Sequence, residues 1–86
     1  MEVRFHRKFY KLYERLPAKI QTRFEERLVI FQREPLHPTL RNHSLSGQWI
    51  DRRSISITGD YRAIYKEVDE KTALFEAIGT HSQLYG

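Results

Sequence analysis

The spacing of apolar residues changes at the sixth position of the chain. Residues 1–5 alternate between apolar and charged side chains, which predicts a short strand. Beyond them, apolar residues recur three or four positions apart with basic residues between them, as on an amphipathic helix. Leu16-Pro17 interrupts this helix, because proline disfavours helical backbone before it but suits the first turn of a new helix. The pattern predicts an αα-hairpin of residues 6–16 and 17–33, with these apolar positions: Phe5, Phe9, Leu12, Tyr13, Leu16, Ile20, Phe24, Leu28 and Phe31.

The second half of the chain is patterned like strands. Glu34-Pro35 ends the second helix, and the proline-rich residues 35–47 predict an irregular loop. Three β-like runs follow, separated by short turns: Gln48–Ile57, Tyr61–Val68 and Thr72–Ile78. Short turns join antiparallel partners. The residues from Gly79 to Gly86 form a separate tail.

This element order predicts one α+β domain, residues 1–86. It consists of an N-terminal strand, the αα-hairpin and a three-stranded antiparallel meander, with both helices packed on one face of the sheet. The other face is then at least partly open. We expect the charged and aromatic strand residues to gather there, as on surfaces that bind nucleic acid.

Composition narrows the function classes. The 86 residues include 15 Lys+Arg against 11 Asp+Glu, a net charge of +4 that suits a polyanionic partner. Most cations of residues 35–66 are arginines, which suit bidentate phosphate contacts. Cysteine is absent, which excludes a disulfide framework, a cysteine nucleophile and a thiolate metal site. No apolar run approaches the ~20 residues that span a membrane, so we expect a soluble, cytoplasmic protein.

The remaining candidate residues suit metal-free RNA cleavage. The sequence has no phosphate-binding glycine loop, nucleophile elbow or HExxH motif, and its histidines do not predict a metal site. RNA cleavage by its own 2′-hydroxyl needs a base, an acid and cations that stabilise the charged phosphorus centre, and an aromatic ring can stack on a base. The candidates are His43, His81, Asp60, Tyr85, Arg53 and Arg62. Structural roles stay open for them, Arg53 as an ion-pair partner and Tyr85 as a packed tail residue, while Trp49 is expected in the core.

Several segments together resemble the RelE/ParE superfamily of bacterial toxins, most closely its YafQ-like branch. They are the αα-hairpin, HSLSGQW at residues 43–49, Arg53, GDYRAIY at residues 59–65 and GTHSQLYG at residues 79–86. The resemblance covers essentially the whole chain, and its last two segments are the most specific. It implies a ribosome-dependent endoribonuclease that cuts translated mRNA without a cofactor.

The resemblance also implies roles for individual residues. His81 matches the branch's C-terminal catalytic histidine, with the aromatic Tyr85 four residues on. His43 matches its histidine before the second strand, and Asp60 its acidic residue at the start of the third. Phosphate or RNA contacts fall to Arg62, helped by Arg53, and to Tyr61, which takes the place of an aromatic residue. Which group is the acid and which the base stays open.

Two departures from the branch leave other functions open. Ala77 stands where the branch has an arginine on the last strand, and Ser56 where it has a histidine. Arg62 or Arg53 would then have to supply the missing positive charge. The alternatives are a ParE-like toxin that acts on DNA gyrase, and a catalytically degenerate homologue that only binds antitoxin.

The resemblance implies protein and nucleic-acid partners. They are a cognate antitoxin, the ribosome with its mRNA, and operator DNA that the toxin–antitoxin complex binds through the antitoxin. An acidic or amphipathic antitoxin segment would suit the cationic domain through helix-in-groove contacts or strand addition at a sheet edge.

Overall fold

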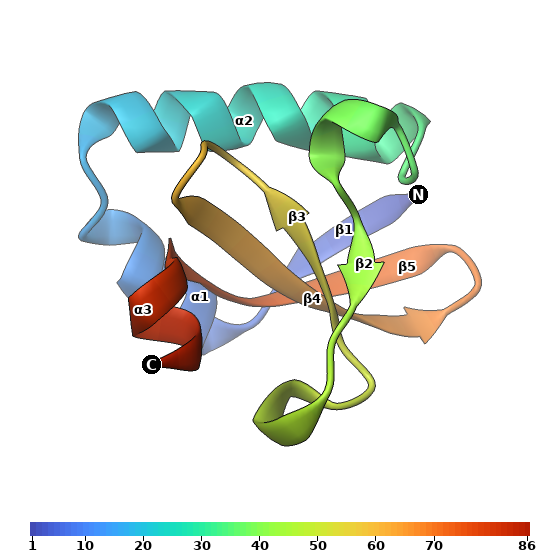
Figure 1. The fold of residues 1–86 in the computed structure, drawn as a ribbon. Coiled ribbons are helices and arrows are strands. Elements are labelled where there is room, and N and C mark those ends of the chain that lie inside the picture. The colour runs from blue at the N-terminus through green and yellow to red at the C-terminus, as the bar shows by residue number, and fades with distance from the viewer.

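The two longest strands, β4 (Tyr61–Asp69) and β5 (Thr72–Thr80), form the central hairpin of a five-stranded mixed sheet in the computed structural model, which describes all 86 residues (Figure 1). On one side, β3 (Arg53–Ser56) and then β2 (His43–Ser44) continue the sheet in antiparallel pairing. On the other side, β1 (Glu2–Phe5) pairs with β5 in parallel. The strand order is β1-β5-β4-β3-β2, which confirms the predicted meander and adds an edge strand at each side.

The αα-hairpin covers one face of this sheet. It consists of α1 (Arg7–Glu14) and α2 (Ala18–Arg33), and α2 runs across the sheet in Figure 1. Aromatic rings fill the space between helices and sheet, and Phe75 of β5 lies at their centre. Its ring centroid lies 5.3–6.0 Å from those of Phe5, Phe9, Phe24, Phe31 and Tyr65. Burial of such large apolar rings is the main stabilising contribution of this face.

A polar contact fixes the angle between the two helices. Tyr13 donates its hydroxyl hydrogen to Glu25 Oε2 at 2.7 Å, and its carbonyl accepts from Gln21 Nε2 at 2.9 Å. Burial, together with the neighbouring Glu25 carboxylate, raises the pKa of Tyr13 to about 12. The phenol is therefore a hydrogen-bond donor throughout the physiological pH range.

The predicted strand Gln48–Ile57 is wrong in its first half. Residues 47–49 form a 3₁₀ turn, Asp51 has a positive φ of 68°, and the strand begins only at Arg53. The physical reason is that Trp49 packs away from the strand while Ile50 is 60% exposed, so their apolar character does not reflect strand alternation. The predicted loop 35–47 contains a 3₁₀ turn at Pro38–Leu40 and the two-residue strand β2.

The sheet face opposite the αα-hairpin is more covered than the sequence predicts. The tail folds into a short helix, α3 (His81–Tyr85), whose Leu84 is buried against Ile64 of β4 and Ala77 of β5. Trp49 packs onto the same cluster and donates its indole hydrogen to the Leu84 carbonyl at 2.9 Å. Only the part of this face beside α3 stays open. No helix of the protein is both long and apolar enough to cross a membrane.

Candidate active site

Strand alternation places Arg62 on the face opposite the αα-hairpin. Successive side chains of a strand point to opposite faces, so Ala63 and Tyr65 enter the aromatic core while Arg62 and Ile64 point the other way. The ladder places Ser54 directly opposite both Ile64 and His43. His43, Ser54 and Arg62 therefore lie on the same face.

The Arg62 guanidinium is held by three acceptors. Its Nε donates to Ser54 Oγ at 2.8 Å, and its Nη2 lies 3.0 Å from the Arg41 carbonyl and 3.3 Å from the Ser54 carbonyl. None of these contacts involves Nη1. Burial lowers the pKa of Arg62 from its ordinary value; the nearby Tyr85 opposes this shift, and the Arg41 charge adds to it. The group stays cationic, because arginine does not deprotonate in proteins.

His43 lies beside this guanidinium. Its Nδ1 is 3.0 Å from the Arg41 carbonyl oxygen and 3.3 Å from Arg62 Nη2. The Arg41 carbonyl thus contacts both the imidazole and the guanidinium. It is positioned by Arg41's own left-handed backbone, with φ 47°.

Helix α3 supplies two further rings. The His81 and Tyr85 ring centroids lie 4.6 Å apart, tilted by 60°, as their four-residue spacing on a helix allows. The backbone N–H of His81 donates to the Asp60 carbonyl at 3.0 Å, which ties the start of α3 to the turn before β4. The Tyr85 hydroxyl is buried and has no hydrogen-bond partner. It lies close enough to the Arg62 guanidinium to act on the pKa of that group.

A capping box holds α3 in place. The Thr80 hydroxyl accepts from the Gln83 N–H at 3.2 Å, and Gln83 Oε1 accepts from the Thr80 N–H at 2.8 Å. A Cβ at position 79 would lie 2.7 Å from Gln83 Oε1, so a larger residue than Gly79 would displace this glutamine from the capping box. The sequence Thr80-His-Ser-Gln83 carries this signal and could have predicted the helix.

Loss of the cap should destabilise the protein measurably. We expect Thr80→Ala to lower the free energy of unfolding by about 1 kcal/mol, because it leaves an amide at the helix start without its acceptor. Urea denaturation measures this difference. Thr80→Ser is the matched control, since it retains the hydroxyl oxygen. Equal stability of Thr80→Ala and the wild type would contradict the role of the cap.

These elements enclose one open cleft of about 360 Å³. Its lining comes from β2 and the following loop, the turn before β4, β4 and α3. The lining residues are His43, Leu45, Ser46, Gly59, Asp60, Arg62, His81 and Tyr85. All four predicted catalytic residues and Arg62 therefore lie in one cleft.

The other two predicted RNA-binding residues lie elsewhere. Arg53 is opposite Tyr65, hence on the αα-hairpin side of the sheet, where its Nε donates to Asn42 Oδ1 at 2.8 Å. Tyr61 also points to that side and packs against the aromatic core. Ala77 is 2% exposed beneath Leu84, and the Ser56 hydroxyl donates to the Thr58 carbonyl. Arg62 is the guanidinium that lies in the cleft.

Two residues that the sequence did not single out support the site. Ser54 supplies both a hydroxyl and a carbonyl to Arg62, and Arg41 supplies the carbonyl shared by Arg62 and His43. A serine within an apolar strand run is the only sequence signal for the first, and a backbone acceptor has none. The structure brings together no group of three or more His, Asp or Glu side chains that could hold a metal ion.

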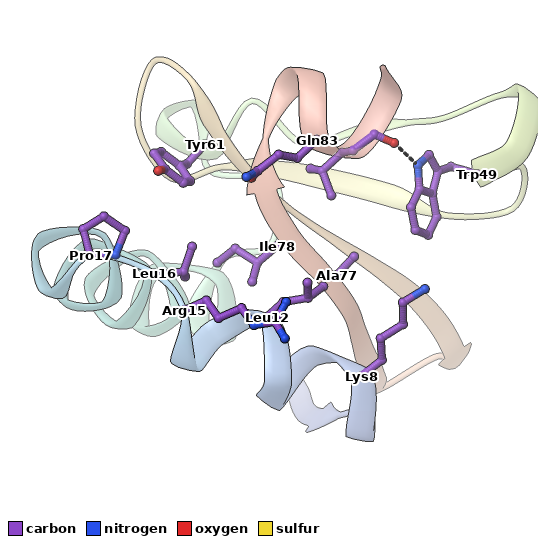
Figure 2. A pocket seen from close by; sticks show the side chains of 11 residues that line it. Lys8, Leu12, Arg15, Leu16, Pro17, Trp49, Tyr61, Ala77, Ile78 and Gln83 are labelled. Atoms are coloured by element: carbon purple, nitrogen blue, oxygen red, sulfur yellow. Dashed lines mark hydrogen bonds between the residues drawn. The ribbon is translucent and has the colours of Figure 1, made fainter.

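A second concavity lies on the other side of α3. It is an apolar groove of about 350 Å³ between α1 and α3, with Ala77 and Ile78 of β5 between them and Trp49 at one end (Figure 2). Lys8 of α1 and Arg15, which directly follows this helix, lie at the rim of the groove. Leu84 belongs both to this groove and to the helix that carries His81 and Tyr85, so the two concavities share a wall.

Solved structures of bacterial toxins share this fold. The crystal structure of YafQ from E. coli superposes with a TM-score of 0.82 at 21% identity, covering 99% of this chain and 98% of that one. YafQ in the E. coli DinJ–YafQ complex gives 0.71 at 24% identity, covering 99% and 98%. The toxin–antitoxin complex RelBE2 from Mycobacterium tuberculosis gives 0.76 at 24% identity, covering 93% and 96%. At these identities the likeness establishes the fold.

The sequence itself establishes the family. No curated protein matches the chain significantly. The family described as "Bacterial toxin of type II toxin-antitoxin system, YafQ" matches residues 1–86, the whole length. The protein belongs to the YafQ family of type II toxin–antitoxin toxins.

Proposed function

We propose that this toxin is a ribosome-dependent endoribonuclease that cleaves translated mRNA by metal-free acid–base chemistry. The observation that carries the proposal is the cleft itself, which gathers His43, Asp60, Arg62, His81 and Tyr85 from separate segments. The family resemblance assigns proton transfer to His43, Asp60 and His81 and phosphate binding to Arg62, and Tyr85 takes the place of its aromatic residue. Two histidines beside a guanidinium provide a base, an acid and a cation for attack on a phosphodiester.

Hydrogen-bond geometry favours His43 as the base. Arg62 Nη2 carries two hydrogens and lies near three acceptors, the Arg41 carbonyl at 3.0 Å and the Ser54 carbonyl and His43 Nδ1 at 3.3 Å each; we assign the two hydrogens to the carbonyls. Neutral His43 then carries its proton on Nδ1 and donates it to the Arg41 carbonyl at 3.0 Å, because an unprotonated Nδ1 would face that oxygen lone pair to lone pair. The Nε2 lone pair is left free to accept a proton. Asp60, in the same cleft, is the alternative base.

The proposed reaction transfers two protons. His43 Nε2 takes the proton of the 2′-hydroxyl as the 2′ oxygen attacks the adjacent phosphorus. The bond from phosphorus to the 5′ oxygen breaks, and protonated His81 gives a proton to that leaving oxygen. The products are a 2′,3′-cyclic phosphate and a 5′-hydroxyl end.

Arg62 and Tyr85 are suited to bind the phosphate. Arg62 uses Nε and Nη2 for its hydrogen bonds to the three acceptors. Its Nη1 is therefore available for a phosphate oxygen. The unpartnered Tyr85 hydroxyl can donate to the same group. A guanidinium fixed before substrate arrives stabilises developing negative charge without reorganisation.

Mapping of 5′ ends after induction tests the proposal. The toxin is induced in a bacterial host, and a reporter mRNA is compared with the same mRNA lacking its start codon. New 5′ ends within the reading frame of the translated reporter alone are expected. Growth arrest with intact mRNA and DNA-damage signalling would instead indicate a gyrase toxin. Absence of arrest, with antitoxin binding retained, would indicate a degenerate homologue.

The groove of Figure 2 is the proposed contact for the cognate antitoxin. Its apolar lining and the cations Lys8 and Arg15 at its rim suit an amphipathic segment with acidic residues. An occupant would also contact Leu84 and could thereby act on the helix that carries His81 and Tyr85.

Charge reversal at the rim should weaken antitoxin binding. We expect the double variant Lys8→Glu, Arg15→Glu to bind the cognate antitoxin about tenfold more weakly, mainly through slower association. The control Lys19→Glu, Arg23→Glu makes the same charge change on α2, outside the groove. Surface plasmon resonance at two salt concentrations measures both. Equal losses in the two double variants would show that only net charge matters and would contradict the groove as the contact.

A further inference from the structure

The Asn42 side chain makes three hydrogen bonds beside the cleft, yet it does not line it. Its Oδ1 accepts from Arg53 Nε at 2.8 Å, and its Nδ2 donates to the Pro35 carbonyl at 2.9 Å and to the Tyr65 hydroxyl at 2.8 Å. These partners belong to β3, to the segment after α2 and to β4. One side chain thus joins three segments.

The partners of Asn42 are themselves firmly held. Tyr65 is 1% exposed within the aromatic core, and its ring lies edge-on to Phe31 with centroids 4.9 Å apart. Burial raises the pKa of Tyr65, which keeps its phenol protonated. Asn42 is therefore fastened to the most rigid part of the protein.

Apart from Asn42, the segment that carries His43 is held by Leu40, which is buried in the core, and by the short pairing of β2 with β3. β2 has two residues, His43 and Ser44, and both are exposed. Asn42 lies directly between His43 and Arg41, whose left-handed φ of 47° is unfavourable for a side chain other than glycine. A fixed Asn42 determines where the Arg41 carbonyl points, and that carbonyl orients both His43 and Arg62.

We infer that Asn42 is a positioning residue, which fixes the Arg41 carbonyl and through it the Nδ1-protonated form of His43. Its importance for cleavage rests on the proposed function, whereas its effect on the imidazole does not. Arg53 then supports the site indirectly, as the hydrogen-bond donor to Asn42. The sequence alone suggests a direct contact between Arg53 and RNA. The site thus depends on a hydrogen-bond network on the opposite face of the sheet.

Nuclear magnetic resonance of the His43 ring nitrogens tests the inference directly. In the wild type we expect neutral His43 to carry its proton on Nδ1, and in Asn42→Ala we expect a shift toward the Nε2-protonated form. Arg27→Ala is the matched control: it removes a bond of 3.0 Å to the Thr39 carbonyl in the same loop but leaves Asn42 untouched. Asn42→Asp is a milder variant that keeps the acceptor for Arg53, and it should shift the tautomer part of the way.

Cleavage of mRNA on programmed ribosomes gives the second readout. We expect Asn42→Ala to lower the maximal rate by about 10- to 100-fold with little change in half-saturating toxin concentration, because misplaced groups slow chemistry more than binding. Wild-type ring signals in the Asn42 variants, or an equal shift in Arg27→Ala, would overturn the inference. If Asn42→Ala does not fold, the His43 tautomer in Asn42→Asp decides between the two outcomes. A tautomer that depends on Asn42 in a protein that cleaves nothing would uphold the inference and refute the proposed function.

Discussion

His81→Ala should reduce cleavage of translated mRNA by about 10²- to 10⁴-fold, the factor that a positioned general acid supplies. The leaving 5′ oxygen needs a proton, and His81 is the cleft residue left for that role if His43 is the base. The alanine also removes the ring beside Tyr85, 4.6 Å away. Single-turnover cleavage on programmed ribosomes measures the rate, and arrest of growth after induction gives the cellular counterpart.

Ser82→Ala is the matched control for this variant. Ser82 is the next residue on α3, is exposed, and does not line the cleft. The Ser82→Ala variant should cleave mRNA and arrest growth like the wild type. His81→Gln separates proton donation from packing, because glutamine fills similar space but cannot act as an acid near neutral pH. Cleavage by His81→Gln at the wild-type rate would refute the assignment of His81 as the acid.

The fold follows from signals that lie within short stretches of sequence. The helical spacing of residues 6–33 and the turns at 58–60 and 69–71 are local, and the αα-hairpin and meander formed as predicted. The parallel pairing of β1 with β5 joins the two ends of the chain. No local pattern encodes it. Residues 48–52 are not a strand, although their apolar residues suggest one. Trp49 instead packs against α3, which is distant in the sequence, and no local pattern reveals that contact.

The candidate site also has a part that the sequence predicts and a part that depends on the three-dimensional structure. Residue type makes His43, Asp60, His81 and Tyr85 candidates, the family resemblance gives them roles, and the structure brings them into one cleft. Arg62 and Tyr61 are neighbours in sequence, so strand alternation puts them on opposite faces and only one can line the cleft. The same alternation places Arg53 on the face opposite the cleft. The predicted RNA contacts of Tyr61 and Arg53 could therefore be tested only once the strand register was known.

What the sequence could not reveal is how the guanidinium is held. Ser54 Oγ and two backbone carbonyls fix Arg62, and the carbonyls come from β3 and from the loop before β2. Such contacts depend on the register of β3 against β4 and on the backbone conformation of Arg41. They explain how the chain places a cation in the cleft although Ala77 stands where the family resemblance leads one to expect an arginine.

Arg62→Gln should lower the cleavage rate by about 10²- to 10³-fold, since it removes a preorganised donor from the charged transition state. Arg62→Lys should recover only part of this loss. A lysine ammonium retains the charge, but it cannot donate to Ser54 and to the phosphate with the planar geometry of a guanidinium. Binding of the toxin to ribosomes should change little in either variant, so the loss should appear in the maximal rate.

Lys66→Gln controls for net charge in this comparison. Lys66 is an exposed cation of the same strand and lies outside the cleft. Its loss lowers the positive charge of the protein as much as Arg62→Gln does, and it should leave the maximal rate unchanged. Equal rates for Arg62→Gln and the wild type would show that another group binds the phosphate. The exposed Arg41 would then be the first candidate, because its charge already acts on the Arg62 guanidinium.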